Sequence, residues 1–250
     1  AKALMAYLDC PCLYFPSFKD DDPIASAYGY ERRLGVREGY FPVLVAVDEK
    51  LLDALISNSG AAKAGADQYE LDIESVRRYR EKVLSMTPGD GKALFSGLAA
   101  ESGPLVPETG NMVDGDGNDL GFVIDGQGRP PYWNDDTQMT YPVILAMIPV
   151  RNPWEIFAYI PFGGFGGCAS EASVMAVAKY WYDCHGAVAS VVSHDKLEFD
   201  VPVPVAGDDA MVLAGEQLGF CSSLVQDGWT EVTLADALRK LRKWRFRWHE

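Results

Sequence analysis

The sequence lacks any long hydrophobic run. Its longest apolar stretch, residues 174–182, is interrupted by Lys179 and is far shorter than the ~20 residues with which a helix crosses a bilayer. The first residues carry one positive charge and too short an apolar run for a secretory signal. These absences predict a soluble protein of the cytoplasm that has no membrane partner.

The sequence also lacks the even number of regularly spaced cysteines that is typical of disulfide-rich proteins. The five cysteines are Cys10, Cys12, Cys168, Cys184 and Cys221. An odd, scattered set does not form a disulfide framework, so we expect reduced thiols, as in a cytoplasm. Cys10-Pro11-Cys12 lacks the two-residue spacer of a zinc knuckle or a redox pair, and a turn that enters a strand is the simpler interpretation.

Basic residues are scarce, because 22 lysines and arginines face 36 acids and leave a formal net charge of −14. Such a charge repels polyphosphate and anionic lipid, which argues against nucleic acid and membranes as partners. It favours a basic protein partner or serves solubility alone. The remaining composition, with 48% hydrophobic residues, is ordinary for a globular chain that needs no metal or disulfide to fold. The composition does not indicate an oligomeric state.

Large hydrophobic residues are few between residues 101 and 136, which hold eight acids, one base, seven glycines and four prolines. Such a stretch cannot offset the entropy lost on ordering its backbone. We therefore expect a flexible segment at 103–136 between an N-terminal α/β region, 1–102, and a C-terminal α+β domain, 137–250. Asp114-x-Asp116-x-Asn118 could begin a calcium loop, but Asp119 stands where glycine is needed, so an acidic turn is favoured and calcium binding stays open.

Periodicity predicts the secondary structure on both sides of this segment. The N-terminal region shows a strand at 40–47, a helix that Asp48 caps, a second helix at 71–86 and a short helix within 91–100. The C-terminal region shows strands at 141–150, 156–160, 187–192, 197–201 and 244–248, and helices at 170–185, 207–219 and 233–241. Together these predict an α+β fold, a mixed sheet with flanking helices, containing a strand-helix-strand unit and an appended hairpin.

Several C-terminal motifs resemble a known family. They are Pro153-Trp154-Glu155-Ile156-Phe157, Tyr180-Trp181, His194-Asp195-x-Leu197-Glu198-Phe199, Glu216-Gln217, Phe220-Cys221 and Trp244-x-Phe246-x-Trp248. This part of the chain resembles the bacterial family of domain of unknown function 4253, and residues 1–60 are similar to the N-terminal region of its longer members. In the loop after Gly164 this chain keeps the family's Cys, here Cys168, but has other residues where the family has Asn and Pro. The resemblance implies no known activity.

Cys168 is the strongest catalytic candidate, because it lies just before a predicted helix whose N-terminal dipole would favour the thiolate. His194 could act as its base and Asp195 could orient that base. His185, at the far end of the same helix, would be ~20 Å away. These residues predict, as an alternative function, a thiol-dependent hydrolase or transferase. The favoured interpretation is a structural thiol that turns inward against Trp181 or Phe165, where burial would raise its pKa.

Cofactor motifs are incomplete. His194, Asp195 and Glu198 share a hairpin, but no paired His or Cys ligands accompany them, so we expect no metal site. Gly164-x-Gly166-x-x-Ala169 has the spacing of a dinucleotide-binding loop without the strand context that the loop requires. We expect no cofactor.

The C-terminal end combines bases with aromatics, which can bind single-stranded nucleic acid. The bases are Arg239, Lys240, Arg242, Lys243, Arg245 and Arg247, and the aromatics are Trp244, Phe246 and Trp248. Strict alternation instead predicts a strand with its aromatics in the core and its arginines along a solvated edge. With no complete catalytic set, the sequence favours a non-enzymatic protein-interaction module, of accessory or immunity type. Its candidate binding residues are Glu198, Glu216, Arg245 and Arg247.

Overall fold

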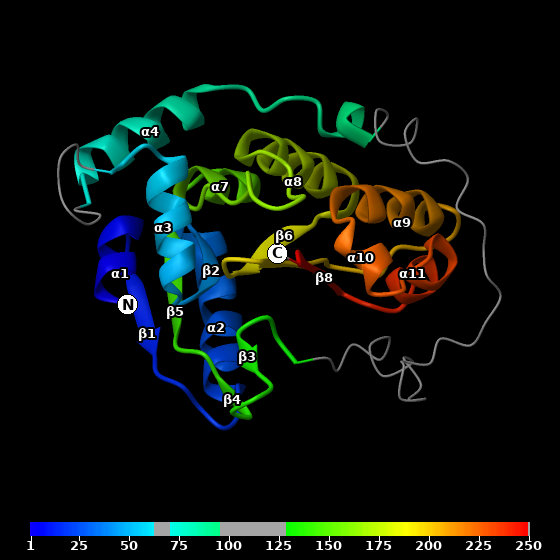
Figure 1. The fold of residues 1–250 in the computed structure, drawn as a ribbon, viewed down its shortest axis with the longest axis horizontal. Coiled ribbons are helices and arrows are strands. Elements are labelled where there is room, and N and C mark those ends of the chain that lie inside the picture. The colour runs from blue at the N-terminus through cyan, green and yellow to red at the C-terminus, as the bar shows by residue number, and fades with distance from the viewer. Residues whose placement is uncertain (63–70, 96–128, 250) are drawn as a thin grey trace.

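The computed structural model describes residues 1–62, 71–95 and 129–249 (Figure 1). Its helices are α1 (Lys2–Leu8), α2 (Asp22–Glu38), α3 (Glu49–Asn58), α4 (Ile73–Ser85), α7 (Ile156–Tyr159), α8 (Glu171–His185), α9 (Asp209–Phe220), α10 (Ser223–Gln226), α11 (Glu231–Leu238) and the 3-10 helix η1 (Pro153–Glu155). Its strands are β1 (Cys12–Phe15), β2 (Phe41–Ala46), β3 (Trp133–Asn134), β4 (Met139–Thr140), β5 (Val143–Ile148), β6 (Val188–Val192), β7 (Lys196–Asp200) and β8 (Lys243–Arg247). Within these described stretches, no helix has the length and apolar character to cross a membrane.

Six strands form one mixed sheet in the order β1-β5-β2-β6-β7-β8, and β3 and β4 pair separately. Strands β2 and β6 are parallel, whereas the other neighbours are antiparallel. The α+β class, the mixed sheet and the β6–β7 hairpin are therefore confirmed. In the C-terminal half, η1, α7 and α8 connect β5 to β6, and β2 lies between these two strands in the sheet.

The strand predicted at 156–160 is wrong, because these residues continue η1 into helix α7. Asn152 and Glu155 form a capping box around Pro153, with the Glu155 carboxylate accepting from the Asn152 backbone N–H at 3.0 Å. A capping box and a proline in the first turn both start helices. This local signal outweighs the strand preference of the apolar run that follows.

The two regions that flank the predicted flexible segment share the sheet, since β2 lies between β5 and β6. Residues 103–128 of that segment lie outside the described residues, so the proposed division of the chain stays a prediction. The last residues of the segment are described: Tyr132 is buried, and the β3 pair Trp133–Asn134 is hydrogen-bonded to β4.

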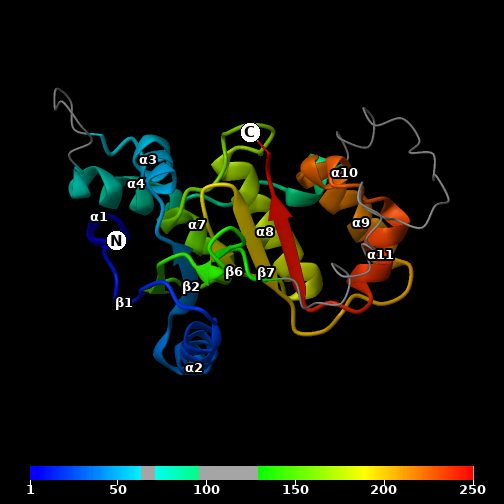
Figure 2. The same cartoon turned by 60° about the horizontal axis from the view of Figure 1, so that its bottom comes forward.

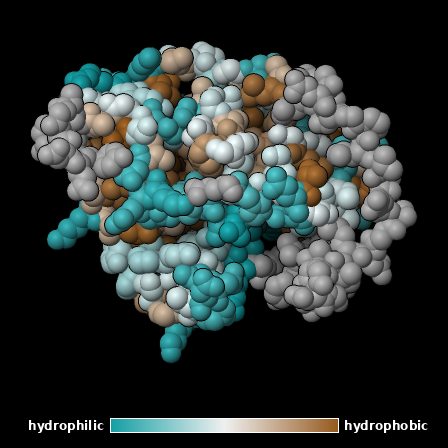
Figure 3. All heavy atoms as spheres, viewed as in Figure 1, coloured by the Kyte–Doolittle hydropathy of each residue, from teal (hydrophilic) through white to brown (hydrophobic). Residues whose placement is uncertain are grey.

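The sheet is covered unevenly. Helices α3, α4, α7, α8 and α9 contribute to the larger core on one face, whereas α2 packs over β2 and β5 on the other. Figure 2 shows α2 on the opposite side of the sheet from α3 and α4. In Figure 3, hydrophilic residues gather over α2, and more hydrophobic residues show among the helices above it. On the α2 side, the β6–β8 end of the sheet carries polar side chains, which form the candidate site.

Candidate functional site

The first part of the site lies where two parallel strands end. Asp48 follows β2 and His194 follows β6, and neighbouring parallel strands bring their carboxyl ends to the same edge of a sheet. The Asp48 carboxylate lies 2.5 Å from His194 Nδ1, off the N–H direction, and Asp195 lies 3.6 Å from Nε2. We call this cavity of about 220 Å³ the His194 pocket; Tyr141, Lys196 and Arg247 also line it.

Asp48 was predicted only as a helix cap. It does cap α3, accepting from the Lys50 backbone N–H at 2.8 Å, and its second carboxylate oxygen faces His194. Asp195 accepts from the Ser193 hydroxyl at 3.0 Å and lies 3.6 Å from the Arg247 guanidinium, so it shapes the β6–β7 turn. The repeated pattern of a buried strand followed by a polar residue was the sequence signal that could have paired Asp48 with His194.

Cys168 does not lie beside His194, the base that the thiol-enzyme alternative requires. It lies half-buried in the loop before α8 and packs against the apolar core. Burial raises the pKa of Cys168 to about 12, and the nearby Cys221 and Glu171 add to that rise. Among the contacts of the described residues, none joins Cys168 to His194. The site therefore shows no thiol-base pair.

We expect Cys168 to alkylate about tenfold more slowly than the exposed Cys184 at neutral pH, because a desolvated thiol with a raised pKa holds little thiolate. Competitive labelling with iodoacetamide, read by mass spectrometry, measures both rates in one sample. His194→Ala should leave the Cys168 rate unchanged within about twofold. Selective labelling of Cys168 that slows in this variant would instead support the thiol-dependent alternative.

The second part of the site is a charged groove, a cavity of about 610 Å³ on the α2 side of the sheet. Ser190, Glu198, Asp200, Lys243 and Arg245 form its floor; α2 and residues 129–133 form its walls. Glu198 is only 1% exposed, yet its carboxylate lies 2.6 Å from Lys243 Nζ and 2.7 Å from Arg245 Nε. Asp200 accepts from Arg32 at 2.8 Å and from the Tyr28 hydroxyl at 3.0 Å.

The register of β7 and β8 explains this network. Glu198 stands opposite Arg245, and Asp200 stands opposite Lys243. Opposite charges at directly facing positions stabilise an antiparallel pair. Alternation correctly predicted that the β8 aromatics Trp244 and Phe246 are buried in the core. It did not predict that carboxylates of β7 would neutralise the basic side chains, which were expected to line a solvated edge.

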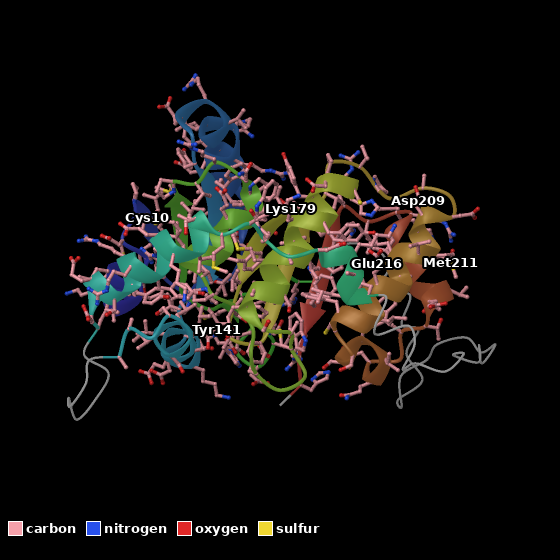
Figure 4. The ribbon with its side chains drawn as sticks, turned by 90° about the horizontal axis from the view of Figure 1, so that it is seen from above. Cys10, Tyr141, Lys179, Asp209, Met211 and Glu216 are labelled. Atoms are coloured by element: carbon pink, nitrogen blue, oxygen red, sulfur yellow. The ribbon has the colours of Figure 1, made fainter. Side chains whose placement is uncertain are left out.

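Glu216 lines neither the His194 pocket nor the charged groove. It lies on α9, labelled in Figure 4 with Asp209 and Met211 of the same helix. Its buried carboxylate accepts from the Tyr180 hydroxyl at 2.8 Å and from Trp181 Nε1 at 3.0 Å. Burial, together with the hydrogen bond to Glu216, raises the pKa of Tyr180. Of the four candidate binding residues, the groove brings together Glu198 and Arg245, Arg247 lines the His194 pocket, and Glu216 joins α8 to α9.

Residues 129–135 separate three depressions of the surface. Besides the His194 pocket and the charged groove, a mainly apolar cavity of about 280 Å³ lies between β8 and α11. The Arg129 guanidinium stacks over Trp133 at 4.2 Å, and Lys196 Nζ donates to the Pro131 carbonyl at 3.5 Å. These contacts hold the segment over β7 and β8, so the three depressions form one uneven surface.

Metal ligands do not gather in this surface. Within the described parts of the chain, no group of three or more His, Cys, Asp or Glu side chains could hold an ion. The possible calcium loop at Asp114, Asp116 and Asn118 lies outside the described residues. The glycine loop before α8 brings Gly164 against the Glu171 carboxylate, 2.6 Å from an added Cβ, which is an unsuitable neighbour for a pyrophosphate.

Comparison with protein families supports the resemblance seen in the C-terminal motifs. Residues 144–249 match the model of the family described as Domain of unknown function (DUF4253). The matched range contains His194, Glu198 and Arg245, whereas Asp48 and α2 lie outside it. Searches of the curated proteins and of the solved structures found no match for this chain.

Proposed function

We propose that this chain is a non-enzymatic protein-interaction module of the bacterial cytoplasm, of accessory or immunity type, which binds a basic segment of a partner protein at the charged groove. The observation that carries the proposal is the acidic pair Asp20 and Asp21, which lines this groove beside Tyr132 and Trp133. Neither carboxylate of the pair forms an ion pair with the cations that the structure describes. Lys19 and Arg129 also line the groove, and Asp21 accepts from the Tyr132 hydroxyl at 3.5 Å. A lysine or arginine of the partner would therefore bind at the Asp20 and Asp21 carboxylates rather than along the whole groove.

The charge of the whole chain supports the same class of partner. A formal net charge of −14 draws a basic protein toward the surface and repels nucleic acid. The basic residues of β8 do not reverse this preference, because Lys243 and Arg245 already pair with Glu198. Aromatic residues beside polar groups are typical of the residues that contribute most to protein interfaces.

Catalysis has less support than binding. The candidate thiol and the candidate base have separate sets of neighbours, and the acids and bases of the groove floor neutralise one another. A nucleophile needs an adjacent base or a lowered pKa. We therefore retain the interaction module as the one proposed function.

The experiment uses the full chain as bait in extracts of its host at low and high salt, with bound proteins identified by mass spectrometry. The test variant is Asp20→Asn with Asp21→Asn, and the control is Asp208→Asn with Asp209→Asn. Asp21 is the N-capping residue of α2 and Asp208 that of α9, and neither forms a side-chain capping bond. Asp20 precedes the cap of α2, and Asp209 follows the cap of α9. The control therefore removes the same charge at the start of another helix, from residues that do not line the groove.

We expect a basic partner whose affinity falls roughly fivefold to thirtyfold in the Asp20 and Asp21 variant, since each exposed charge contact contributes about 0.5–1 kcal/mol. The control variant should bind nearly as well as the wild type. Equal losses in both variants would show that the groove is not the binding surface. Recovery of no partner at either salt concentration would contradict the proposed function itself.

A further inference from the structure

Two cysteines come together where α1 passes into β1. Asp9 ends α1 in the left-handed conformation, at φ 47°, the chain bends at Cys10, and β1 begins at Cys12. Only Pro11 separates the two cysteines. The Cys12 thiol donates to the Cys10 carbonyl, with 3.3 Å between Sγ and O. Both residues are half-buried free cysteines, and Cys10 is labelled in Figure 4.

A buried arginine lies beside this pair. Arg80, on α4, is 5% exposed and donates to the Tyr7 carbonyl at 2.5 Å, while its guanidinium stacks on the Tyr159 ring at 4.1 Å. Its Nε has no hydrogen-bond partner, and it forms no ion pair with a carboxylate among the described residues. The hydrogen bond with Cys12 and burial raise the pKa of Cys10 well above its usual range, whereas the Arg80 charge lowers the pKa of Cys10 and of the partly exposed Asp9.

A buried cation without an acid is unusual, because burying a charge is costly unless an opposite charge or good hydrogen bonds compensate it. Tyr7 and Tyr159 supply only a carbonyl and two ring faces. The missing counter-charge would come from thiolate at Cys10 and Cys12, and two adjacent thiolates repel each other unless a cation joins them. The arrangement is therefore that of a site for a complex of net negative charge.

We propose that Cys10 and Cys12 together bind one soft monovalent metal ion, Cu(I), as a bis-thiolate, and that Arg80 balances the charge of the complex. Two thiols release two protons as the ion binds, and two thiolates with one Cu⁺ carry a net charge of −1. The Arg80 guanidinium then makes the buried site neutral. This inference does not depend on the proposed interaction function.

The number of ligands favours Cu(I) over zinc at this pair of cysteines. Thiolates select Cu(I), whereas structural zinc needs four ligands. The residues that the structure describes provide no third metal-ligating side chain here.

The test is a competition for Cu(I) between the reduced full chain and the chromophoric chelator bicinchoninate, without oxygen. We expect the wild type to withdraw one Cu(I) per chain, and Cys10→Ser and Cys12→Ser each to abolish this withdrawal. Cys184→Ser replaces an exposed cysteine on α8 and should keep this withdrawal. The Asp20→Asn, Asp21→Asn variant should also keep it, which separates this test from that of the proposed function.

Arg80 is tested by a second pair of variants. Arg80→Met should weaken Cu(I) binding roughly tenfold, as the loss of an outer partner does at other metal sites, whereas Arg80→Lys should keep most of the affinity. Thermal unfolding of each variant separates loss of the site from loss of the fold. Full Cu(I) binding by Cys10→Ser, or none by the folded wild type, would overturn the proposal. Tighter binding of Zn(II) than of Cu(I) would overturn the identity of the ion.

Discussion

Replacing Trp181 with alanine is expected to lower the free energy of unfolding by about 4 kcal/mol, the range for removing a large buried aromatic side chain. Trp181 is 0% exposed and lies at the centre of the aromatic core. It stacks on Phe246, with ring centroids 5.6 Å apart, and meets Trp244 and Phe220 edge to face at 5.7 and 5.1 Å. Alanine would leave a cavity that touches α9 and β8, and these elements cannot close it without losing their other contacts.

Urea unfolding followed by tryptophan fluorescence and circular dichroism measures this loss, which corresponds to a fall in Tm of about 8–16 °C for a chain of this size. Tyr182→Ala is the matched control, because Tyr182 follows on the same helix and is 37% exposed. Its contact with Trp154 contributes only about 1 kcal/mol. Equal costs for the two substitutions would show that the core is not organised around Trp181.

Glu198→Ala is expected to cost about 2–3 kcal/mol of stability, the second largest effect. The substitution removes the carboxylate that Lys243 and Arg245 share on the groove floor, while Asp200 still lies 3.0 Å from Lys243. Removing one partner of a buried ion pair costs about 3–5 kcal/mol, and the partial exposure of the two cations reduces that cost. Glu198→Gln keeps the shape and the acceptor oxygen while it removes the charge, so we expect roughly half the loss.

The control for Glu198 is the exposed pair of Asp236 and Arg239, 2.6 Å apart on the surface of α11. Asp236→Ala should cost less than about 1 kcal/mol, since surface ion pairs contribute little. Urea unfolding at low and high salt separates the two cases, because salt screens buried pairs less than exposed ones. A loss for Glu198→Ala that vanishes at high salt would contradict the buried network.

Local sequence signals predicted many of the elements. Asp48 caps α3, and the helix predicted at 170–185 is observed as α8. The alternation at 244–248 placed the β8 aromatics in the core. These features depend on residues within one or two turns of each other, where capping bonds and side-chain periodicity act. The sequence could therefore be interpreted element by element, although α1 and α2 were not predicted.

Within the candidate site, residue type pointed to His194 and Glu198, but their partners come from distant parts of the chain. Asp48 reaches His194 because β2 and β6 are parallel neighbours, and Arg32 reaches Asp200 from helix α2. No periodicity encodes such contacts, since strand order and register are settled by how the whole sheet buries its apolar faces.

The sequence by itself determined the α+β class, the caps, the hairpin and the aromatic alternation, because each follows from the chemistry of near neighbours. Tertiary structure alone decided the order of the strands, the separate surroundings of Cys168 and His194, and the position of Arg80 beside Cys10. The physical reason is that burial and electrostatic pairing act between residues that are close in space. Their distance along the chain is unrelated to that closeness, as with Arg80 and the carbonyl of Tyr7.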